Sequence, residues 1–340
     1  MRAAFLHGKE DIRLAETEAA PLEPGGLCLK VLTCGICGSD ARVYFNGPSS
    51  RYLSPVILGH ELAAEIAAVG PGIEGFTVGD LVTVAPVIPC MACGPCLRGE
   101  DNLCENGGVL GCTIHGGMAE YLTLPGEMVR VGGVVKVPEG VEQRDAALTE
   151  LVGCCLHGLD KLGLRAGESV LIIGDGPIGL TFLQLARGLG ASYVATSGRR
   201  RQRRRLASEL GADEALDATA TDLKDHFDGR SLDRVIVAAS NLEATRDAME
   251  VVRPGGAVLL FAGYVPGASL DLRLNDVHYR ELSIQGSIDC TIEDFRRAVG
   301  LLPGLAMAEL VSGAFPLDEI ESAFLATRGP DAVKTVLEFT

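Results

Sequence analysis

Short apolar runs separated by turn residues dominate the first part of the chain, to about Pro138. Glycine and proline bound these runs, which read LCLKVL (27–32), AAEIAAV (63–69), LVTVAP (81–86) and AEYLTLP (119–125). Such runs are typical of β-strands, and helical periodicity is scarce among them. The pattern predicts an irregular, mostly β domain.

The pattern changes from about Glu150, where strand-like runs begin to alternate with helical stretches. The strand-like runs are ESVLIIG (168–174), YVATS (193–197), DRVIVAAS (233–240), AVLLFAG (257–263) and LSIQGS (282–287). Helical periodicity covers IGLTFLQLARGLG (178–190) and RRRQRRRLASELG (199–211). Alternation of strands and helices predicts a doubly wound parallel sheet covered on both faces.

The length of the chain, 340 residues, exceeds the size at which one hydrophobic core usually stops growing. We therefore predict an α/β protein of two domains. The first comprises residues 1–149 and, after the chain returns to it, residues 287–340. The second comprises residues 150–286 and contains the parallel sheet.

The net charge and the hydropathy pattern argue against two classes of partner, nucleic acids and membranes. A formal net charge of −15 is unfavourable for binding a phosphate backbone, so no nucleic-acid partner is expected. The N-terminal stretch MRAAFLHGKEDIRL has no apolar run of signal-peptide length, and no run along the chain is long enough to span a bilayer. We expect a cytoplasmic protein with no membrane partner.

Four of the eleven cysteines lie close together in the segment Cys90-Met-Ala-Cys93-Gly-Pro-Cys96-Leu-Arg-Gly-Glu-Asp-Asn-Leu-Cys104. Repeated C-x-x-C spacing is typical of a zinc site. Four thiolates fill the tetrahedral shell of zinc and leave no position for a substrate, so the predicted role is structural. The alternatives are four unrelated buried cysteines or two disulfides.

Three other fragments carry metal-binding side chains beside turn glycines. They are Cys34-Gly-Ile-Cys37-Gly-Ser39-Asp40, Gly59-His60-Glu61 and Thr149-Glu150. Each is weak alone, because a Gly-His-Glu sequence is more often a surface turn and a lone glutamate often begins a helix in solvent. Their order along the chain carries more information than any one of them.

The motifs GICGSD, GHE, the four-cysteine segment, TELVGCCLHGL and GDGPIG follow one another in this order. In this the chain resembles the zinc-dependent medium-chain dehydrogenases of the sorbitol and threonine dehydrogenase type, over essentially its whole length. The resemblance implies a β-rich, GroES-like catalytic domain and a Rossmann-type domain that binds a dinucleotide. It also implies a homodimer or homotetramer.

Carried over by position, Cys37, His60 and Glu150 resemble the ligands of a catalytic zinc, with Glu61 as an alternative ligand or a nearby carboxylate. Glu150, where simple alcohol dehydrogenases have a second cysteine, favours the polyol branch. One thiolate, one imidazole and one carboxylate leave a coordination position open for the substrate oxygen. A cation there stabilises an alkoxide, so that hydride transfer needs no strong base.

Three residues near Cys37 have roles implied by the same resemblance. Asp40 is expected to orient His60 through the second ring nitrogen. Ser39 resembles the hydroxyl that takes the proton of the alcohol. Many relatives have a histidine three residues later, whereas this chain has Arg42, which stays protonated and cannot act as a base. Either water completes the proton relay, or Arg42 binds an anion, or Arg42 is a solvated surface side chain.

The glycine motif of the second domain comes directly after the strand SVLII and opens a predicted helix. In this context G-x-G-x-x-G predicts dinucleotide binding, with the pyrophosphate at the helix N-terminus. The motif residues expected to contact the cofactor are Gly174, Gly176, Pro177, Ile178 and Gly179.

An arginine run stands at the end of the next strand, where NAD enzymes usually have an acidic residue. The run is Gly198-Arg199-Arg200-Arg201-Gln202-Arg203-Arg204-Arg205. Guanidinium groups bind a 2′-phosphate, so we predict NADP in preference to NAD, with Gly198, Arg199, Arg200 and Arg203 in contact with it. The alternatives are a solvated basic helix face and a nucleic-acid or localisation patch.

Two residues are candidates for binding the substrate. Asp289 stands where sorbitol-oxidising relatives commonly have an arginine, so a polyol or cyclitol that carries an amino group is the hypothesis. Tyr44 is the second candidate, as a residue that stacks on the substrate or binds its hydroxyls. Asp289 alternatively faces solvent or caps a helix that begins near Thr291.

The predicted function is hydride transfer between a secondary alcohol of a small polyol, cyclitol or amino-polyol and NADP or NAD, giving the ketone. A threonine dehydrogenase-like or general secondary-alcohol activity is the alternative. A zinc-binding nucleic-acid module that uses Arg199–Arg205 has no need of Ser39, Glu150 and a glycine loop in this order. A zinc-free quinone reductase has no need of Cys37, His60 and the four cysteines.

Overall fold

The computed structural model describes residues 1–229 and 232–339. The chain divides into two units, residues 1–153 with 290–340 and residues 154–289. Each unit has its own sheets and its own apolar core. Helix α5 (Thr149–Leu162) begins in the first unit and continues into the second.

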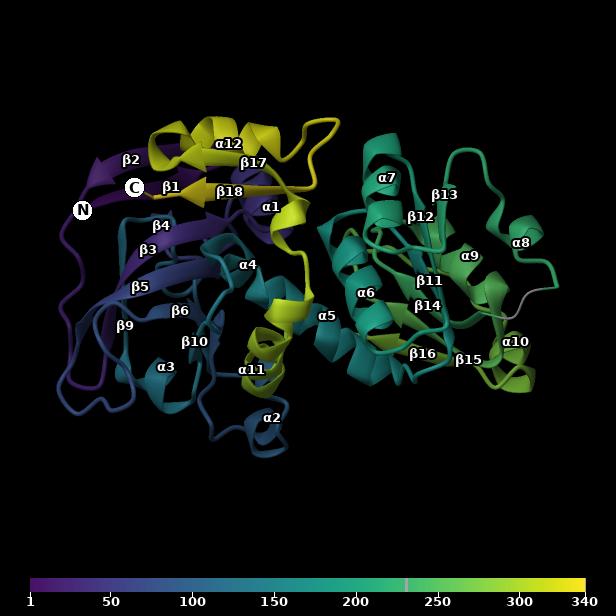
Figure 1. The fold of residues 1–340 in the computed structure, drawn as a ribbon, viewed down its shortest axis with the longest axis horizontal. Coiled ribbons are helices and arrows are strands. Elements are labelled where there is room, and N and C mark those ends of the chain that lie inside the picture. The colour runs from purple at the N-terminus through teal and green to yellow at the C-terminus, as the bar shows by residue number, and fades with distance from the viewer. Residues whose placement is uncertain (230–231, 340) are drawn as a thin grey trace. The chain divides into compact units, whose positions relative to one another are not determined.

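The first unit is built mainly of antiparallel strands (Figure 1). Its large sheet has the order β10 (Val134–Lys136), β6 (Leu81–Val84), β5 (Glu61–Val69), β3 (Leu27–Gly35), β18 (Lys334–Glu338) and β17 (Val311–Pro316), with β9 (Tyr121–Leu124) also paired to β3. A second sheet contains β2 (Asp11–Glu16), β1 (Arg2–Gly8) and β4 (Val56–Ile57), and β7 (Val87–Ile88) pairs with β8 (Gly108–Val109).

Helices and turns connect these strands. They are α1 (Gly38–Asn46), α2 (Gly94–Leu97), α3 (Gly126–Arg130), α4 (Gln143–Ala147), α11 (Ile292–Leu301) and α12 (Ile320–Ala326). β3 shows why the sequence folds in this way, since Leu27, Leu29 and Val31 alternate with less buried residues and pack into the core. Each of the four apolar runs predicted as strands in this part of the chain contains a strand: β3, β5, β6 and β9.

The C-terminal segment joins the large sheet of the first unit, because β18 pairs antiparallel with β3 through the register Leu337 to Cys34. The C-terminal segment therefore belongs to the same unit as residues 1–153. This pairing brings Lys334, the first residue of β18, to the end of the sheet where β5 begins at Glu61.

The second unit contains a six-stranded parallel sheet. Its order is β13 (Glu214–Asp217), β12 (Tyr193–Gly198), β11 (Ser169–Ile173), β14 (Leu232–Val237), β15 (Val252–Leu260) and β16 (Ser283–Gly286). Helices α6 (Pro177–Gly188) and α7 (Arg201–Glu209) pack on β11–β13, and α9 (Leu242–Val251) packs on β14 and β15 (Figure 1). The short helices α8 (Leu223–His226) and α10 (Leu274–Tyr279) complete the unit.

This order is that of a Rossmann-type sheet, in which the direction of winding reverses between β11 and β14. β11 is buried along Val170–Ile173, as expected for a strand covered by helices on both faces. The predicted fold class, α/β with a β-rich domain and a doubly wound parallel sheet, is confirmed. In the described part of the chain, no helix is both long enough and apolar enough to cross a membrane.

Candidate active site

Three metal-binding side chains of the first unit come together where β3, α1 and β5 meet. Cys37 is the N-cap of α1, and His60 and Glu61 stand at the start of β5. Their ligand atoms all lie within 4.8 Å of one another. The thiol, the imidazole and the carboxylate are the donors that zinc prefers, so this group fits a zinc ion with an open coordination position.

The imidazole of His60 has a neighbour at each ring nitrogen. Nδ1 lies 3.5 Å from Oδ1 of Asp40, and Nε2 lies 3.5 Å from Oγ of Ser39. Burial lowers the pKa of His60, but the charges of Asp40 and Cys37 outweigh burial and raise this pKa well above its ordinary value. Asp40 is itself fixed, because its Oδ2 accepts the backbone N–H of Cys37 at 3.0 Å.

Glu61 is held by a lysine from the far end of the chain. Nζ of Lys334 donates to Oε1 of Glu61 at 2.6 Å, and the side chains are 4% and 0% exposed. Burial lowers the pKa of Lys334, but the negative charges of Glu61 and Cys37 raise it above its ordinary value. A Cβ at Gly35 would lie 2.2 Å from Oε2 of Glu61, so a residue with a side chain at position 35 would displace this carboxylate.

Sequence reasoning missed Lys334, because 273 positions separate it from Glu61. The strand register that unites them depends on the antiparallel pairing of β18 with β3. The segment VKTVLEF (333–339) alternates in a strand-like manner, but nothing local in it marks the lysine as a buried residue.

Glu150 is placed differently from Glu61. It lies in the first turn of α5 and is 8% exposed, outside the group formed by Cys37, His60 and Glu61. Its charge contributes, as one of the smaller causes, to the raised pKa of Lys334. Of the two carboxylates that the resemblance offered, Glu61 is therefore the one already assembled with the thiol and the imidazole.

The four cysteines of segment 90–104 form a second group, with all four sulfur atoms within 4.8 Å of one another. Sγ of Cys93 and Sγ of Cys104 are 3.9 Å apart, close to the separation of about 3.8 Å that tetrahedral Zn–S bonds require. Backbone N–H groups of Ala92 and Cys93 lower the pKa of Cys90 to about 6, which favours its thiolate. None of these four cysteines is in a disulfide, so the disulfide alternative is wrong.

The glycine motif follows β11 and opens α6, as predicted. Gly176 is the N-cap of α6, and Pro177 occupies its first turn. A Cβ at Gly179 would lie 1.9 Å from the carbonyl oxygen of Gly174, so only glycine lets the helix approach the strand this closely. The backbone amides at the start of α6 face the end of the sheet where a dinucleotide pyrophosphate binds in such folds.

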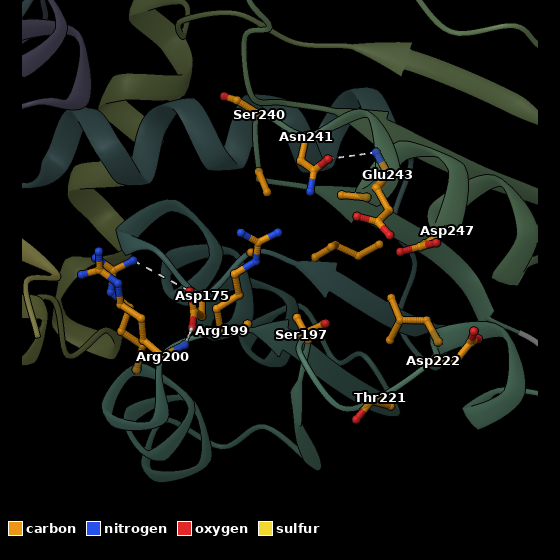
Figure 2. A pocket seen from close by; sticks show the side chains of 18 residues that line it. Asp175, Ser197, Arg199, Arg200, Thr221, Asp222, Ser240, Asn241, Glu243 and Asp247 are labelled. Carbon is orange, nitrogen blue, oxygen red and sulfur yellow. Dashed lines mark hydrogen bonds and ion pairs between the residues drawn. The ribbon is translucent and has the colours of Figure 1, made fainter. Parts of the chain in front are cut away.

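A cavity of about 470 Å³ lies at the carboxyl ends of β11, β12 and β14. Its wall includes Asp175 from the glycine motif, Gly198 from the end of β12, and Arg199, Arg200 and Arg203 from the arginine run. Asp175 and Arg200 lie at one end of the cavity, and Asp222 and Asp247 lie at the other (Figure 2). This is the switch point at which Rossmann-type sheets bind nucleotides.

The arginines of the run are not equivalent. Arg204 binds Asp217 at 2.6 Å and Arg205 binds Glu209 at 2.8 Å, so each has an acidic partner on its own domain. Arg203 lies 3.8 Å from Asp175, and burial together with the charge of Arg200 lowers the pKa of Arg203. Arg199 is exposed, and within residues 1–229 and 232–339 no carboxylate pairs with it.

Known protein families match both parts of the chain, the part with the metal-binding side chains and the part with the glycine motif. Residues 23–141 match the alcohol dehydrogenase GroES-like domain, and residues 177–303 match the zinc-binding dehydrogenase family model. The L-threonine 3-dehydrogenase of Pyrococcus abyssi (strain GE5 / Orsay) is 33% identical over 84% of this chain and 81% of that protein. The chain belongs to the zinc-dependent medium-chain dehydrogenase family.

The similarity to other medium-chain dehydrogenases extends over a larger share of the chain. The sorbitol dehydrogenase of Halalkalibacterium halodurans is 30% identical over 91% of this chain and 90% of that protein. The crystal structure of a zinc-binding dehydrogenase from Sinorhizobium meliloti 1021, bound to NADP, matches with a TM-score of 0.93 and 30% identity, covering 99% of each chain. As a member of this family, the chain is an alcohol or polyol oxidoreductase.

Three further residues with predicted roles in this medium-chain dehydrogenase are Tyr44, Arg42 and Asp289. Tyr44 is 4% exposed and stacks on Phe324, with ring centroids 4.4 Å apart, so it is a core residue with little surface for a substrate. Arg42 is exposed on α1. Asp289 is exposed and has a left-handed backbone, with φ of 51°. The cap of α11 is Thr291, so the capping alternative for Asp289 is wrong.

Proposed function

We propose that this enzyme transfers hydride between a secondary alcohol of a small polyol, cyclitol or amino-polyol and NADP, giving the ketone. The observation that carries the proposal is the assembly of Cys37, His60 and Glu61 within 4.8 Å in a member of a zinc-dependent dehydrogenase family. The test is chelator-sensitive reduction of NADP with a panel of polyols, cyclitols and amino-cyclitols. A chelator that removes both zinc ions and leaves the rate unchanged would contradict it.

In this proposal Cys37, His60 and Glu61 hold the catalytic zinc, and Glu150 is the carboxylate that can replace Glu61. When bound, zinc acts as a Lewis acid that stabilises negative charge on the substrate oxygen. Asp40 fixes the ring of His60 through Nδ1, as metal-binding histidines usually require. Lys334 supplies a positive charge to Glu61 and so balances one of the acidic groups around the metal.

Ser39 is the proposed acceptor of the alcohol proton. Its Oγ lies 3.5 Å from Nε2 of His60, on the side of the ring away from Asp40. Arg42 cannot take the proton further because a guanidinium stays protonated. Since Arg42 is exposed on the same helix, we place the next proton acceptor in solvent rather than on this side chain.

Cys90, Cys93, Cys96 and Cys104 are proposed to bind a second, structural zinc. The sulfur separations and the N–H groups directed at them support this role. No further ligand position remains on a zinc with four thiolates, so this ion takes no part in the reaction. Loss of this zinc is expected to lower thermal stability before it affects the chemistry.

NADP is the proposed cofactor in preference to NAD. Arg199, Arg200 and Arg203 line the cavity at the end of β12, and guanidinium groups bind phosphate strongly. The similarity to a structure bound to NADP supports the same choice. Calorimetric titration with NADP⁺ and NAD⁺ tests it, and tighter binding of NAD⁺ would contradict it.

An amino group on the substrate is proposed on the basis of Asp289, an exposed carboxylate where the resemblance offers an arginine. An L-threonine 3-dehydrogenase-like activity is the second candidate, favoured by the 33% identity to the Pyrococcus abyssi enzyme of that name. The Asp289→Asn variant separates amino from neutral substrates. Equal kcat/KM values for wild type and variant across both classes would remove the role of Asp289.

We also propose that the enzyme is a homodimer or homotetramer in the cytoplasm. β16 is the last strand of its sheet, and three apolar side chains near it are exposed: Leu274 by 76%, Tyr279 by 79% and Ile288 by 59%. An exposed sheet edge with apolar neighbours favours pairing with another chain. Light scattering on the eluting protein gives the number of chains.

A further inference from the structure

The end of β12 lacks the side chain that usually selects NAD. In Rossmann-type folds an acidic residue at this position binds the hydroxyls of the adenosine ribose. β12 ends at Gly198, which has no side chain and lies in the wall of the nucleotide cavity. The residue at position 198, where an acidic residue usually binds the ribose, therefore offers no carboxylate.

The glycine motif supplies a carboxylate to the same place. A Cβ built on Gly198 would lie 2.2 Å from both Cγ and Oδ2 of Asp175 and 2.3 Å from its Cβ. The side chain of Asp175 therefore fills the space that a residue at position 198 would use. Asp175 and an acidic residue at position 198 exclude each other sterically.

The contacts of Asp175 hold it there and leave part of it available. Its Oδ2 accepts the backbone N–H of Arg200 at 3.0 Å, and its Oδ1 lies 3.8 Å from the nearest nitrogen of Arg203. Asp175 is 8% exposed and lines the cavity. A carboxylate has about four lone-pair sites, so acceptor capacity remains for a ribose hydroxyl.

We infer that Asp175 is a cofactor-specificity residue, a ribose-binding carboxylate supplied by the glycine motif instead of by the end of β12. It accepts a hydroxyl of the ribose when NAD binds. When NADP binds, it repels the 2′-phosphate and competes for Arg203, which limits the preference for NADP that the arginines create. The inference rests on the proposed dinucleotide binding.

Calorimetric titration of the full-length protein with NADP⁺ and with NAD⁺ tests this role without relying on catalysis. Asp175→Asn keeps the shape and the acceptor for the N–H of Arg200 but removes the charge. We expect the ratio of the Kd for NAD⁺ to the Kd for NADP⁺ to rise about tenfold. A rise smaller than about threefold, or a fall, would overturn the inference.

Asp247→Asn is the matched control, because it removes one negative charge from the opposite end of the same cavity. The ratio for this variant is expected to stay within about twofold of the wild type. If Asp175→Asn does not fold, as judged by thermal unfolding, Asp175→Ser removes the same charge with a smaller hydrogen-bond acceptor. The same rise is expected for it.

Moving the carboxylate tests the geometry directly. Gly198→Asp alone brings two side chains into one space, so weaker binding of both dinucleotides is expected. Gly198→Asp combined with Asp175→Gly returns the carboxylate to β12, and binding of NAD⁺ is expected to recover at least about tenfold relative to the single variant. No recovery would overturn the inference. If wild-type protein binds neither dinucleotide, the proposed function itself fails.

Discussion

Nζ of Lys334 donates a hydrogen bond of 2.6 Å to Oε1 of Glu61, and solvent reaches neither side chain to more than 4%. This buried pair lies beside the thiol of Cys37 and the imidazole of His60. The carboxylate that we propose as a zinc ligand therefore already has a cationic partner within the protein. The ammonium therefore limits how firmly Glu61 can bind a metal ion.

Removal of the ammonium is expected to destabilise the fold strongly. Lys334→Met leaves the carboxylate of Glu61 buried without its partner, which typically costs about 3–5 kcal/mol. Lys334→Met combined with Glu61→Gln is expected to regain much of this loss, because the uncompensated charge is gone. The measurement is urea-induced unfolding of the metal-free proteins.

Lys136→Met is the control for that experiment. Lys136 binds Asp80 at 2.7 Å in the same unit, but it is 47% exposed, so its loss is expected to cost less than about 1 kcal/mol. Equal losses for Lys334→Met and Lys136→Met would contradict the importance of the buried pair.

The arginine run makes a prediction about the cofactor. Arg199→Ala removes a guanidinium that has no acidic partner among the described residues, and NADP⁺ is expected to bind about tenfold more weakly. Binding of NAD⁺ is expected to change little, because NAD⁺ has no 2′-phosphate. Arg205→Ala serves as the control, since Arg205 is exposed and pairs with Glu209. Calorimetry that finds the same affinity loss in both variants would refute a specific phosphate contact.

The stability of the parallel sheet is expected to depend on the ionisation of Asp233. Burial raises the pKa of Asp233, but hydrogen bonds from Ser169 and from Arg253 outweigh burial and lower it. Because the folded pKa lies below the unfolded one, the stabilisation is present above about pH 4 and is lost as the pH falls through the folded pKa.

The variant that tests this dependence is Asp233→Asn. Its free energy of unfolding is expected to be about 1–3 kcal/mol below that of the wild type near pH 7, with a smaller difference near pH 3. Urea unfolding at the two pH values measures the difference between wild type and variant. Asp228→Asn, on the surface of the same unit, is the control and is expected to change stability little at either pH. If Asp233→Asn lowers the free energy of unfolding by the same amount at both pH values, the ionised carboxylate of Asp233 does not stabilise the sheet as we expect.

Much of the fold follows from local patterns in the sequence. The runs SVLII and YVATS are long enough, and apolar enough, to specify β11 and β12, and the helix after each is marked by its own periodicity. Gly179 is required by a contact within the same motif, so sequence reasoning could identify it. Features decided within one strand, one turn or one helix were predictable in this way.

The residues that sequence reasoning missed depend on contacts between distant segments. Lys334 meets Glu61 only through the register of β18 on β3. Asp175 takes the ribose position only because β12 ends in a glycine beside it. Tyr44 illustrates the opposite error, since it follows the metal-binding motif closely but faces the core, where it packs on Phe324 of α12.

The zinc content of Cys37→Ser, measured together with NADP-linked dehydrogenase activity, tests the central claim most directly. The wild type is expected to hold two zinc ions per chain and the variant one, because the group of Cys90, Cys93, Cys96 and Cys104 is left intact. The rate on the best substrate of the panel is expected to fall about a thousandfold with little loss of stability. A variant that keeps both zinc ions, or that loses one and keeps its activity, would contradict a catalytic zinc held by Cys37, His60 and Glu61.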